Sequence, residues 1–447
     1  MRSIRIDMSS FFQLIDKFRR HAKTQREKGN YFEDLMLRYF SNEPKYQELY
    51  NEVFLWQGFR QYWLERNGED LGIDTGIDLV AKVRDTEDYH AIQCKLYSED
   101  YNLQKKDIDS FFTASGKRPF THRMIVSTTN HWSKHAKDAL KGQHLPVQKI
   151  DLYALEHSVI DWEKYQPKQQ LELKPKKNLR SHQKQALQAV TEQLNYPNIS
   201  RGKLIMACGT GKTFTSLKIA EAMAGRGKRV LFLVPSLSLL SQTLTEWTQE
   251  SSTPLCSFAV CSDSDIGKKR QADEDAVNLL VHELDYPATT NAKRLAEEMQ
   301  SRHKEHKMSV VFSTYHSINV ISEAQNSHLL PEFDFVICDE AHRTTGATFD
   351  GEDDSAFTSV HDEEFIHAKK RLYMTATPRI YSEDVEINAE RDKAKLYGMN
   401  NEAIYGKELF VINFSEAVQR GLLVDYKVIV LAVDESHVNK RLQDLLA

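Results

Sequence analysis

The segment that most constrains the fold of this 447-residue chain is LIMACGTGKT, residues 204–213. The pattern predicts a buried strand, a glycine-containing loop and a helix whose apolar face carries Leu217, Ala220 and Ala224. Backbone N–H groups in such a loop point at phosphate oxygens, and the helix N-terminus adds partial positive charge. The segment therefore predicts an α/β domain that binds ATP.

This loop supplies five residues expected to bind the nucleotide: Gly209, Thr210, Gly211, Lys212 and Thr213. The two glycines let the backbone approach the phosphates, Lys212 reaches the outer phosphates, and the Thr213 hydroxyl takes one coordination position of Mg²⁺. The loop departs from the general G-x4-G-K-[ST] pattern because Met206 replaces its first glycine.

A second segment, the sequence DEAH at residues 339–342, supports the first. It follows a short apolar run that predicts a strand of a parallel sheet, and ligands of such sheets lie at the carboxyl ends of the strands. We therefore expect Asp339 to hold Mg²⁺, Glu340 to polarise the attacking water and His342 to lie at the nucleotide. MTATPR, residues 374–379, follows a further apolar strand, and the order of the three segments argues against a chance acidic surface.

The composition is that of an ordinary globular protein, with 40% apolar and 28% charged residues. No apolar run is long enough to span a bilayer, and the N-terminus does not have the pattern of a secretory signal. We therefore expect a cytoplasmic protein with no membrane partner. The five cysteines lack the spacing of a zinc site or a disulfide scaffold.

The net charge of −5 means that DNA binding must rely on local basic surface. The candidates are the run Lys105, Lys106, Lys117, Arg118 and Arg123, and a second run over residues 168–184. For both runs a merely solvated face is the favoured interpretation. The same interpretation is given to a charged, mainly helical segment, residues 262–307, and to an acidic loop, residues 349–365.

Residues 77–96 predict a β-hairpin with a polar turn. A turn centred near residues 86–87 would place Asp78 opposite Lys95, with Gln93 on the same face and Cys94 on the other. A carboxylate, an amide oxygen and an ammonium group would then converge. That set suits hydrolysis of a phosphodiester: Asp78 and Gln93 hold Mg²⁺, and Lys95 orients or deprotonates water.

Three further observations bear on this site. Glu33, on a predicted helix over residues 30–41, could add a second carboxylate, and Asp74 is an alternative to Asp78 as metal ligand. His131 and His135 stand four residues apart on another predicted helix. Without further ligands a solvated helix face is favoured for this pair.

The D…Q-x-K arrangement, the upstream helix glutamate and the phrase TGIDLVA, residues 75–81, resemble the Mrr branch of the PD-(D/E)xK nucleases. The resemblance implies a restriction-endonuclease-like α/β domain over residues 1–163. Gln93 stands where Glu is commoner, a substitution that Mrr-like members share. The lower negative charge implies weak metal binding or a need for Glu33.

The phosphate loop, DEAH and MTATPR resemble the superfamily 2 helicases and translocases. The resemblance implies a RecA-like lobe with a parallel sheet over residues 179–422, and it makes Gln183 an adenine-reading residue. Thr375 and Thr377 resemble the motif that couples nucleotide state to DNA binding. The resemblance also implies three phosphate contacts to DNA, made by Ser236, Ser313 and Thr314.

Residues 164–178 combine prolines, lysines and glutamines without apolar periodicity, which predicts a linker. The tail contains NNEAIYG, residues 400–406, and FSEAVQRGLLVDYKVIVLAV, residues 414–433. It resembles the point where the single-chain type ISP restriction-modification enzymes pass from the first lobe into the second, so residues 423–447 are expected to begin a truncated second lobe. The implied function is ATP-dependent restriction: movement on double-stranded DNA and cutting by the nuclease domain, with a methyltransferase or specificity module in cis or in trans. No arginine-bearing second lobe and no N-P-P-Y motif follow, which predicts a fragment of a longer protein. The alternatives are a repair helicase with a non-cutting DNA-binding domain and an inactive ATP-binding remnant.

Overall fold

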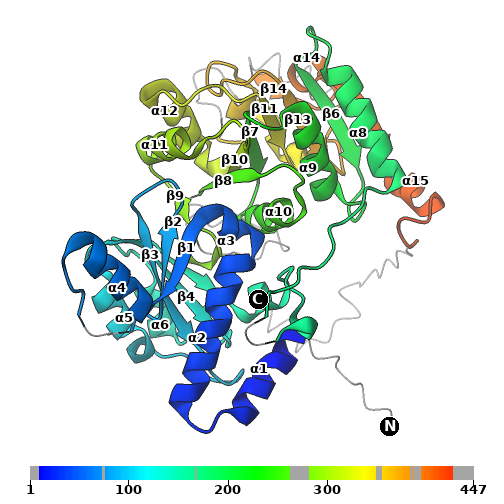
Figure 1. The fold of residues 1–447 in the computed structure, drawn as a ribbon. Coiled ribbons are helices and arrows are strands. Elements are labelled where there is room, and N and C mark those ends of the chain that lie inside the picture. Colours follow the sequence, from blue (N-terminus) through cyan, green and yellow to red (C-terminus); the bar gives the residue numbers. More distant parts are fainter. Residues whose placement is uncertain are drawn as a thin grey trace, which may run out of the picture.

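The computed structural model describes residues 10–72, 76–166, 169–261, 281–348, 355–382, 385 and 394–425. Asp74 and residues 426–447, which include most of the predicted second-lobe start, lie outside these ranges. Figure 1 shows two α/β units side by side, the first coloured blue to cyan and the second green to orange. Within the described ranges, no helix combines the length and hydropathy needed to cross a lipid bilayer.

The N-terminal unit is built on a five-stranded sheet in the order β1-β2-β3-β4-β5. The first three strands pair antiparallel and the last three parallel. The strands are β1 (Tyr50–Leu55), β2 (Leu79–Val83), β3 (Tyr89–Lys95), β4 (Phe120–Ser127) and β5 (Val147–Ile150). The helices are α1 (Ser10–His21), α2 (Gln25–Asn42), α3 (Pro44–Leu49), α4 (Trp56–Asn67), α5 (Asp109–Ser115), α6 (Lys134–Ala139) and α7 (Leu152–Glu156).

Helices cover both faces of this sheet because its side chains alternate. Leu79 and Ile92 pack with α1 and α2 in one apolar cluster. Val80 and Ala91, one position along each strand, pack with α4 and α5 in another. The sheet is therefore the middle layer of three, and the end of the β2–β3 hairpin is held from both sides.

The hairpin register differs from the prediction by two residues. Leu79 pairs with Ile92 and Lys82 with Tyr89, so the same register places Asp78 opposite Gln93, not Lys95. The cause is Asp85, whose left-handed backbone (φ 61°) closes the turn one position earlier than expected. Because the error is an even number of residues, every side chain stays on its predicted face.

The C-terminal unit has an eight-stranded sheet in the order β15-β6-β13-β11-β7-β10-β8-β9, and every pairing is parallel. Its strands are β6 (Arg201–Met206), β7 (Arg229–Val234), β8 (Leu255–Val260), β9 (Ala288–Thr289), β10 (Met308–Thr314), β11 (Phe335–Cys338), β13 (Arg371–Thr375) and β15 (Lys407–Ile412). A separate pair, β12 (Gly346–Thr348) and β14 (Lys395–Tyr397), is antiparallel.

Helices lie on both faces of this sheet as well. They are α8 (Ser181–Leu194), α9 (Lys212–Met223), α10 (Leu237–Glu250), α11 (Ala292–Arg302), α12 (Ile318–His328), α14 (Glu402–Tyr405) and α15 (Phe414–Gln419). The central strands are mainly apolar and almost entirely buried, as expected for parallel strands covered on both sides. The predicted fold class is thus confirmed: a restriction-endonuclease-like α/β domain precedes a RecA-like parallel lobe.

Charged groups are buried where the two units meet. Lys45 on α3 forms an ion pair with Asp285. Glu48, also on α3, bonds to Arg302 of α11 at 3.1 Å and accepts the Tyr286 hydroxyl at 3.2 Å. Arg302 and Glu48 are only 5% and 9% exposed. The interpretation of residues 262–307 as a solvated decoration is therefore wrong for the described part, which packs against the first unit.

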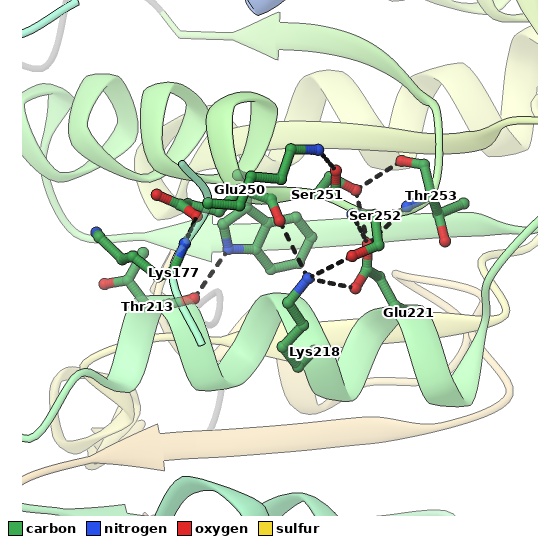
Figure 2. A network of polar contacts seen from close by, with 10 residues as sticks. Lys177, Thr213, Lys218, Glu221, Glu250, Ser251, Ser252 and Thr253 are labelled. Atoms are coloured by element: carbon green, nitrogen blue, oxygen red, sulfur yellow. Dashed lines mark hydrogen bonds and ion pairs between the residues drawn. The ribbon is translucent and has the colours of Figure 1, made fainter. Parts of the chain in front are cut away.

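The predicted linker lies against both units. Near its middle, the Lys174 N–H donates to the Val159 carbonyl at 2.7 Å. Near its end, the Lys177 N–H donates to the Glu250 carboxylate at 2.6 Å. Figure 2 shows how this bond continues: Lys218 of α9 donates to the Glu250 carbonyl at 3.0 Å and pairs with Glu221 at 2.9 Å. The connection is thus tied to α9, the helix that follows the phosphate loop.

Candidate functional sites

The first candidate site lies at the open end of the β2–β3 hairpin. Asp78 immediately precedes β2, and its N–H donates to the Ile92 carbonyl at 3.0 Å. One carboxylate oxygen of Asp78 accepts the Cys94 N–H at 2.6 Å. The carboxylate is therefore fixed against β3, directly beside Gln93.

Gln93 is the most unusual residue of this site. Its side chain is 1% exposed, and its Nε2 donates to the Gly76 carbonyl at 3.0 Å. Its Oε1 is buried and has no hydrogen-bond partner among the described residues. Leaving a buried acceptor unsatisfied costs about 1–3 kcal/mol, so this oxygen points to a ligand. An amide oxygen beside a carboxylate is a donor set that hard divalent cations prefer.

Lys95 and Glu33 complete the cluster. Lys95 is half-buried at the carboxyl end of β3, and Glu33 is half-buried on α2. Burial raises the pKa of the Cys94 thiol, the charges of Asp78 and Glu33 raise it further, and Lys95 opposes them. All three charged side chains thus lie close enough to act on Cys94, which packs toward α2 as expected. The charges of Asp78, Glu33 and Lys95 therefore all act on Cys94, while the catalytic roles of these residues stay predictions.

The second candidate site is the loop between β6 and α9. Gly209 and Gly211 have φ angles of 82° and 84°, which a residue with a side chain rarely adopts. The Thr210 hydroxyl donates to the Ala207 carbonyl at 2.6 Å and folds the loop over its own start. The Thr213 carbonyl accepts the Trp247 indole N–H at 3.2 Å, a contact that the sequence motifs do not reveal.

Charged residues converge on this loop from the end of β11. Lys212 donates to the Met206 carbonyl at 3.3 Å and lies 3.7 Å from the Glu340 carboxylate. Asp339 is buried, and its pKa is raised to about 7, first by burial and then by the charge of Glu340, with Lys212 acting in the opposite direction. The predicted phosphate-binding lysine and the predicted acidic pair therefore form one cluster.

A polar chain runs from this cluster to the end of β13. His342 lies 3.4 Å from Glu340, and its Nδ1 is 3.0 Å from the Thr375 hydroxyl. The Thr377 N–H donates to the same hydroxyl at 3.1 Å. Burial lowers the pKa of His342. DEAH and the predicted coupling segment are thus in direct contact, although they are more than thirty residues apart.

Gln183 lies against the phosphate loop from α8. Its Oε1 accepts the Arg180 N–H at 2.8 Å, and its Nε2 donates to the Gly211 carbonyl at 3.3 Å. His182, to which the sequence assigned no role, lies 2.8 Å from the Thr210 carbonyl through its Nε2. Both side chains therefore support the loop directly.

Two of the three predicted DNA contacts are wrong for this structure. Ser313 and Thr314 are 0% exposed, because β10 lies between β7 and β8 with helices on both faces. The Ser313 hydroxyl donates to the Thr314 carbonyl at 3.1 Å. Ser236 is only partly buried, and its hydroxyl caps α10 by accepting the Leu239 N–H at 3.4 Å.

The structure also corrects two other predictions from the sequence, the basic-surface residue Arg123 and the histidine pair on a helix. Arg123 is 5% exposed and donates to the Ser115 hydroxyl at 2.9 Å, so it does not belong to a basic surface. His131 precedes α6 and His135 lies in it, so the two do not share a helix face. Across the described ranges, no three His, Cys, Asp or Glu side chains gather as a metal site.

Comparison with known families assigns both halves. A family model described as restriction endonuclease matches residues 41–172, and one described as type III restriction enzyme, res subunit, matches residues 176–380. The chain joins a restriction-endonuclease domain to a helicase domain. The predicted pairing of an Mrr-like nuclease with a helicase-like lobe is therefore confirmed.

Whole-chain comparison gives the same order of domains. A solved structure of the ATP-dependent type ISP restriction-modification enzyme LlaBIII bound to DNA is 38% identical, with a TM-score of 0.75 over 97% of this chain. A type I restriction enzyme EcoAI endonuclease subunit of Escherichia coli is 23% identical over 58% of the chain. A probable helicase of African swine fever virus is 28% identical over 57%. The chain spans 27%, 25% and 24% of these relatives, respectively.

Proposed function

We propose that this chain is the nuclease and first motor lobe of an ATP-dependent DNA restriction enzyme related to the type ISP enzymes. ATP hydrolysis drives movement on double-stranded DNA, and the first domain cuts it. The observation that carries the proposal is the unsatisfied, buried Gln93 Oε1 beside Asp78, on a chain that also carries the cluster of Lys212, Asp339 and Glu340.

The nuclease proposal assigns each side chain one task. Asp78 and Gln93 hold Mg²⁺, with Glu33 adding negative charge from α2. When bound, the metal lowers the pKa of water and neutralises phosphate charge. Lys95, at the open end of β3, holds the attacking water and takes up or shares its proton.

The motor proposal follows from the second cluster. Lys212 leaves Glu340 and binds the outer phosphates, while Thr213 and Asp339 hold Mg²⁺. Gln183 contacts the adenine, and Gly209, Thr210 and Gly211 present N–H groups to the phosphates. Glu340 polarises the attacking water. His342 and Thr375 then transmit the loss of the outer phosphate to the end of β13.

The domain boundaries belong to this proposal. We assign residues 1–163 to the nuclease, 164–178 to the linker, 179–422 to the first motor lobe and 423–447 to the start of the second. The full enzyme works in the cytoplasm and draws on a methyltransferase or specificity module in the same chain or in a partner. Double-stranded DNA is the substrate of both activities.

The test compares nicking of supercoiled plasmid by the wild-type chain and by Asp78→Ala, with exposed Asp138→Ala as the control. Nicking that requires Mg²⁺ and is absent only from Asp78→Ala supports the proposal. Equal nicking by all three chains refutes the assignment of Asp78. Absence of nicking by the wild type, together with DNA binding, favours the rival function, a repair motor whose first domain only binds DNA.

A further inference from the structure

The backbone just before β2 determines which way the Gln93 side chain faces. A glutamine ends in one donor and one acceptor, and the two ends can exchange places by a half-turn of the amide. Here the Gly76 carbonyl accepts the Nε2 at 3.0 Å, which leaves Oε1 as the buried atom without a partner. The half-turned amide would instead set two acceptors against each other.

Gly76 is held where only glycine fits. Its φ is +115°, and an added Cβ would lie 2.8 Å from the Ser110 Oγ, 3.1 Å from the Phe111 nitrogen and 3.4 Å from the Gln93 Nε2. Both contacts from α5 are closer than ordinary van der Waals distance. Gly76 thus lies so close to α5 that a larger residue could not fit without a shift of the neighbouring backbone.

We propose that Gly76 is a positioning residue which makes this metal site specific for an amide at position 93, and this rests on the proposed nuclease function. A glutamate at position 93 has the same shape, but it would place a second oxygen 3.0 Å from the Gly76 carbonyl. The carboxylate would then add negative charge for the cation, but it would set an oxygen that cannot donate against the Gly76 carbonyl. Glutamate, the commoner residue at this position in related nucleases, should therefore bind the metal more weakly than glutamine does in this backbone.

The first test measures the Mn²⁺ affinity of the full chain without DNA or nucleotide, by calorimetry or by electron paramagnetic resonance. Gly76→Ala is expected to bind Mn²⁺ about 10- to 100-fold more weakly, the usual cost of losing a group that orients a metal ligand. Gly72→Ala is the matched control, because Gly72 also has positive φ (+84°) but meets nothing within 4 Å. Equal affinity of the Gly76→Ala and Gly72→Ala chains would overturn the role of Gly76.

The second test is Gln93→Glu, which keeps side-chain volume and so avoids the risk that Gly76→Ala misfolds. We expect Mn²⁺ affinity and plasmid nicking to fall at least about tenfold, with ATP binding unchanged. Affinity and nicking equal to or above wild type would sink the inference, since a carboxylate needs no orienting donor.

The outcomes separate the two claims. If the wild-type chain nicks plasmid and Gln93→Glu nicks it equally well, the proposed function stands and the role of Gly76 falls. If the wild type binds Mn²⁺ but does not nick, and the affinity still falls in Gly76→Ala and in Gln93→Glu, the positioning role stands and the nuclease function falls.

Discussion

The two candidate sites of this chain manage charge in opposite ways. At the proposed nuclease site, the buried side chain of Gln93 is neutral, and its oxygen has no partner among the described residues. At the nucleotide site, Lys212 lies beside Glu340, and burial raises the pKa of Asp339 to about 7. The first site is therefore short of negative charge before a cation arrives. At the second site, Lys212 is already paired with Glu340. ATP must therefore displace Glu340 in order to bind Lys212.

This difference follows from where the residues lie. Asp78 and Gln93 lie opposite each other across an antiparallel hairpin, so strand pairing sets how far apart their backbones lie. Lys212, Asp339 and Thr375 come from the ends of three parallel strands or from the turns that follow, where separate segments meet at one sheet edge. The proposed nuclease site thus lies on one hairpin, whereas the proposed nucleotide site draws on three separate segments of the chain.

The largest expected effect is that of Asp78→Ala on cutting. Loss of the carboxylate removes the charged metal ligand, so Mg²⁺-dependent nicking should fall about 10³-fold or more, because a bound metal contributes several kcal/mol. Nucleotide affinity should stay at the wild-type value, because Asp78 belongs to the other sheet. Weakened ATP binding in this variant would break the proposed independence of the two sites.

Lys212→Ala should have the reverse effect. Removing the charge that faces the outer phosphates should lower steady-state ATPase about 10²- to 10³-fold. Mn²⁺ affinity at the nuclease site should not change. Residual ATPase equal to wild type would contradict the assignment of the phosphate loop.

A smaller effect is expected at the contact between the units. Glu48→Ala leaves Arg302, Tyr286 and the Ser257 N–H without their shared acceptor. Breaking a buried ion pair in this way should lower the free energy of unfolding by about 3 kcal/mol, measured by urea titration. The control is Lys105→Ala, whose pair with Asp109 is exposed and worth about 0.3–0.5 kcal/mol. Equal losses of unfolding free energy in the two variants would show that the buried charges between the units stabilise the chain no more than an exposed ion pair does.

The smallest expected effect is a pH dependence specific to the nucleotide site. Because the pKa of Asp339 is raised to about 7, the folded chain holds this proton between about pH 4 and pH 7 and the unfolded chain does not. The contribution of Asp339 to folding stability is therefore lost as the pH rises through this range. Binding of Mg²⁺·ATP requires the ionised form, so affinity should fall about fivefold from pH 7 to pH 6.

ATP also takes up protons near this pH, so Asp339→Asn supplies the baseline. The variant should bind Mg²⁺·ATP weakly and with a shallower pH dependence. An identical pH dependence of Mg²⁺·ATP affinity in the wild type and in Asp339→Asn would show that Asp339 is not the titrating group. Cutting by the nuclease domain in the absence of ATP should not follow this slope.

The sequence predicted the two folds and the groups at each site because these depend on local patterns. A glycine loop between a strand and a helix has few possible structures, and DEAH directly follows its strand. The hairpin register failed because it depended on the left-handed backbone of Asp85. The burial of Ser313 depends on the order of the strands in the sheet. The partners of Arg302 depend on how the two units dock. Neither property can be read from a local sequence pattern.

The central claim is that the chain carries two chemically separate sites, one of which binds a cation without nucleotide. The most direct test is Mn²⁺ binding to the nucleotide-free chain, compared between wild type, Asp78→Ala and Lys212→Ala. We predict one site in the wild type, the same site in Lys212→Ala and loss of that site in Asp78→Ala. Binding that survives in Asp78→Ala but disappears in Lys212→Ala would contradict the claim.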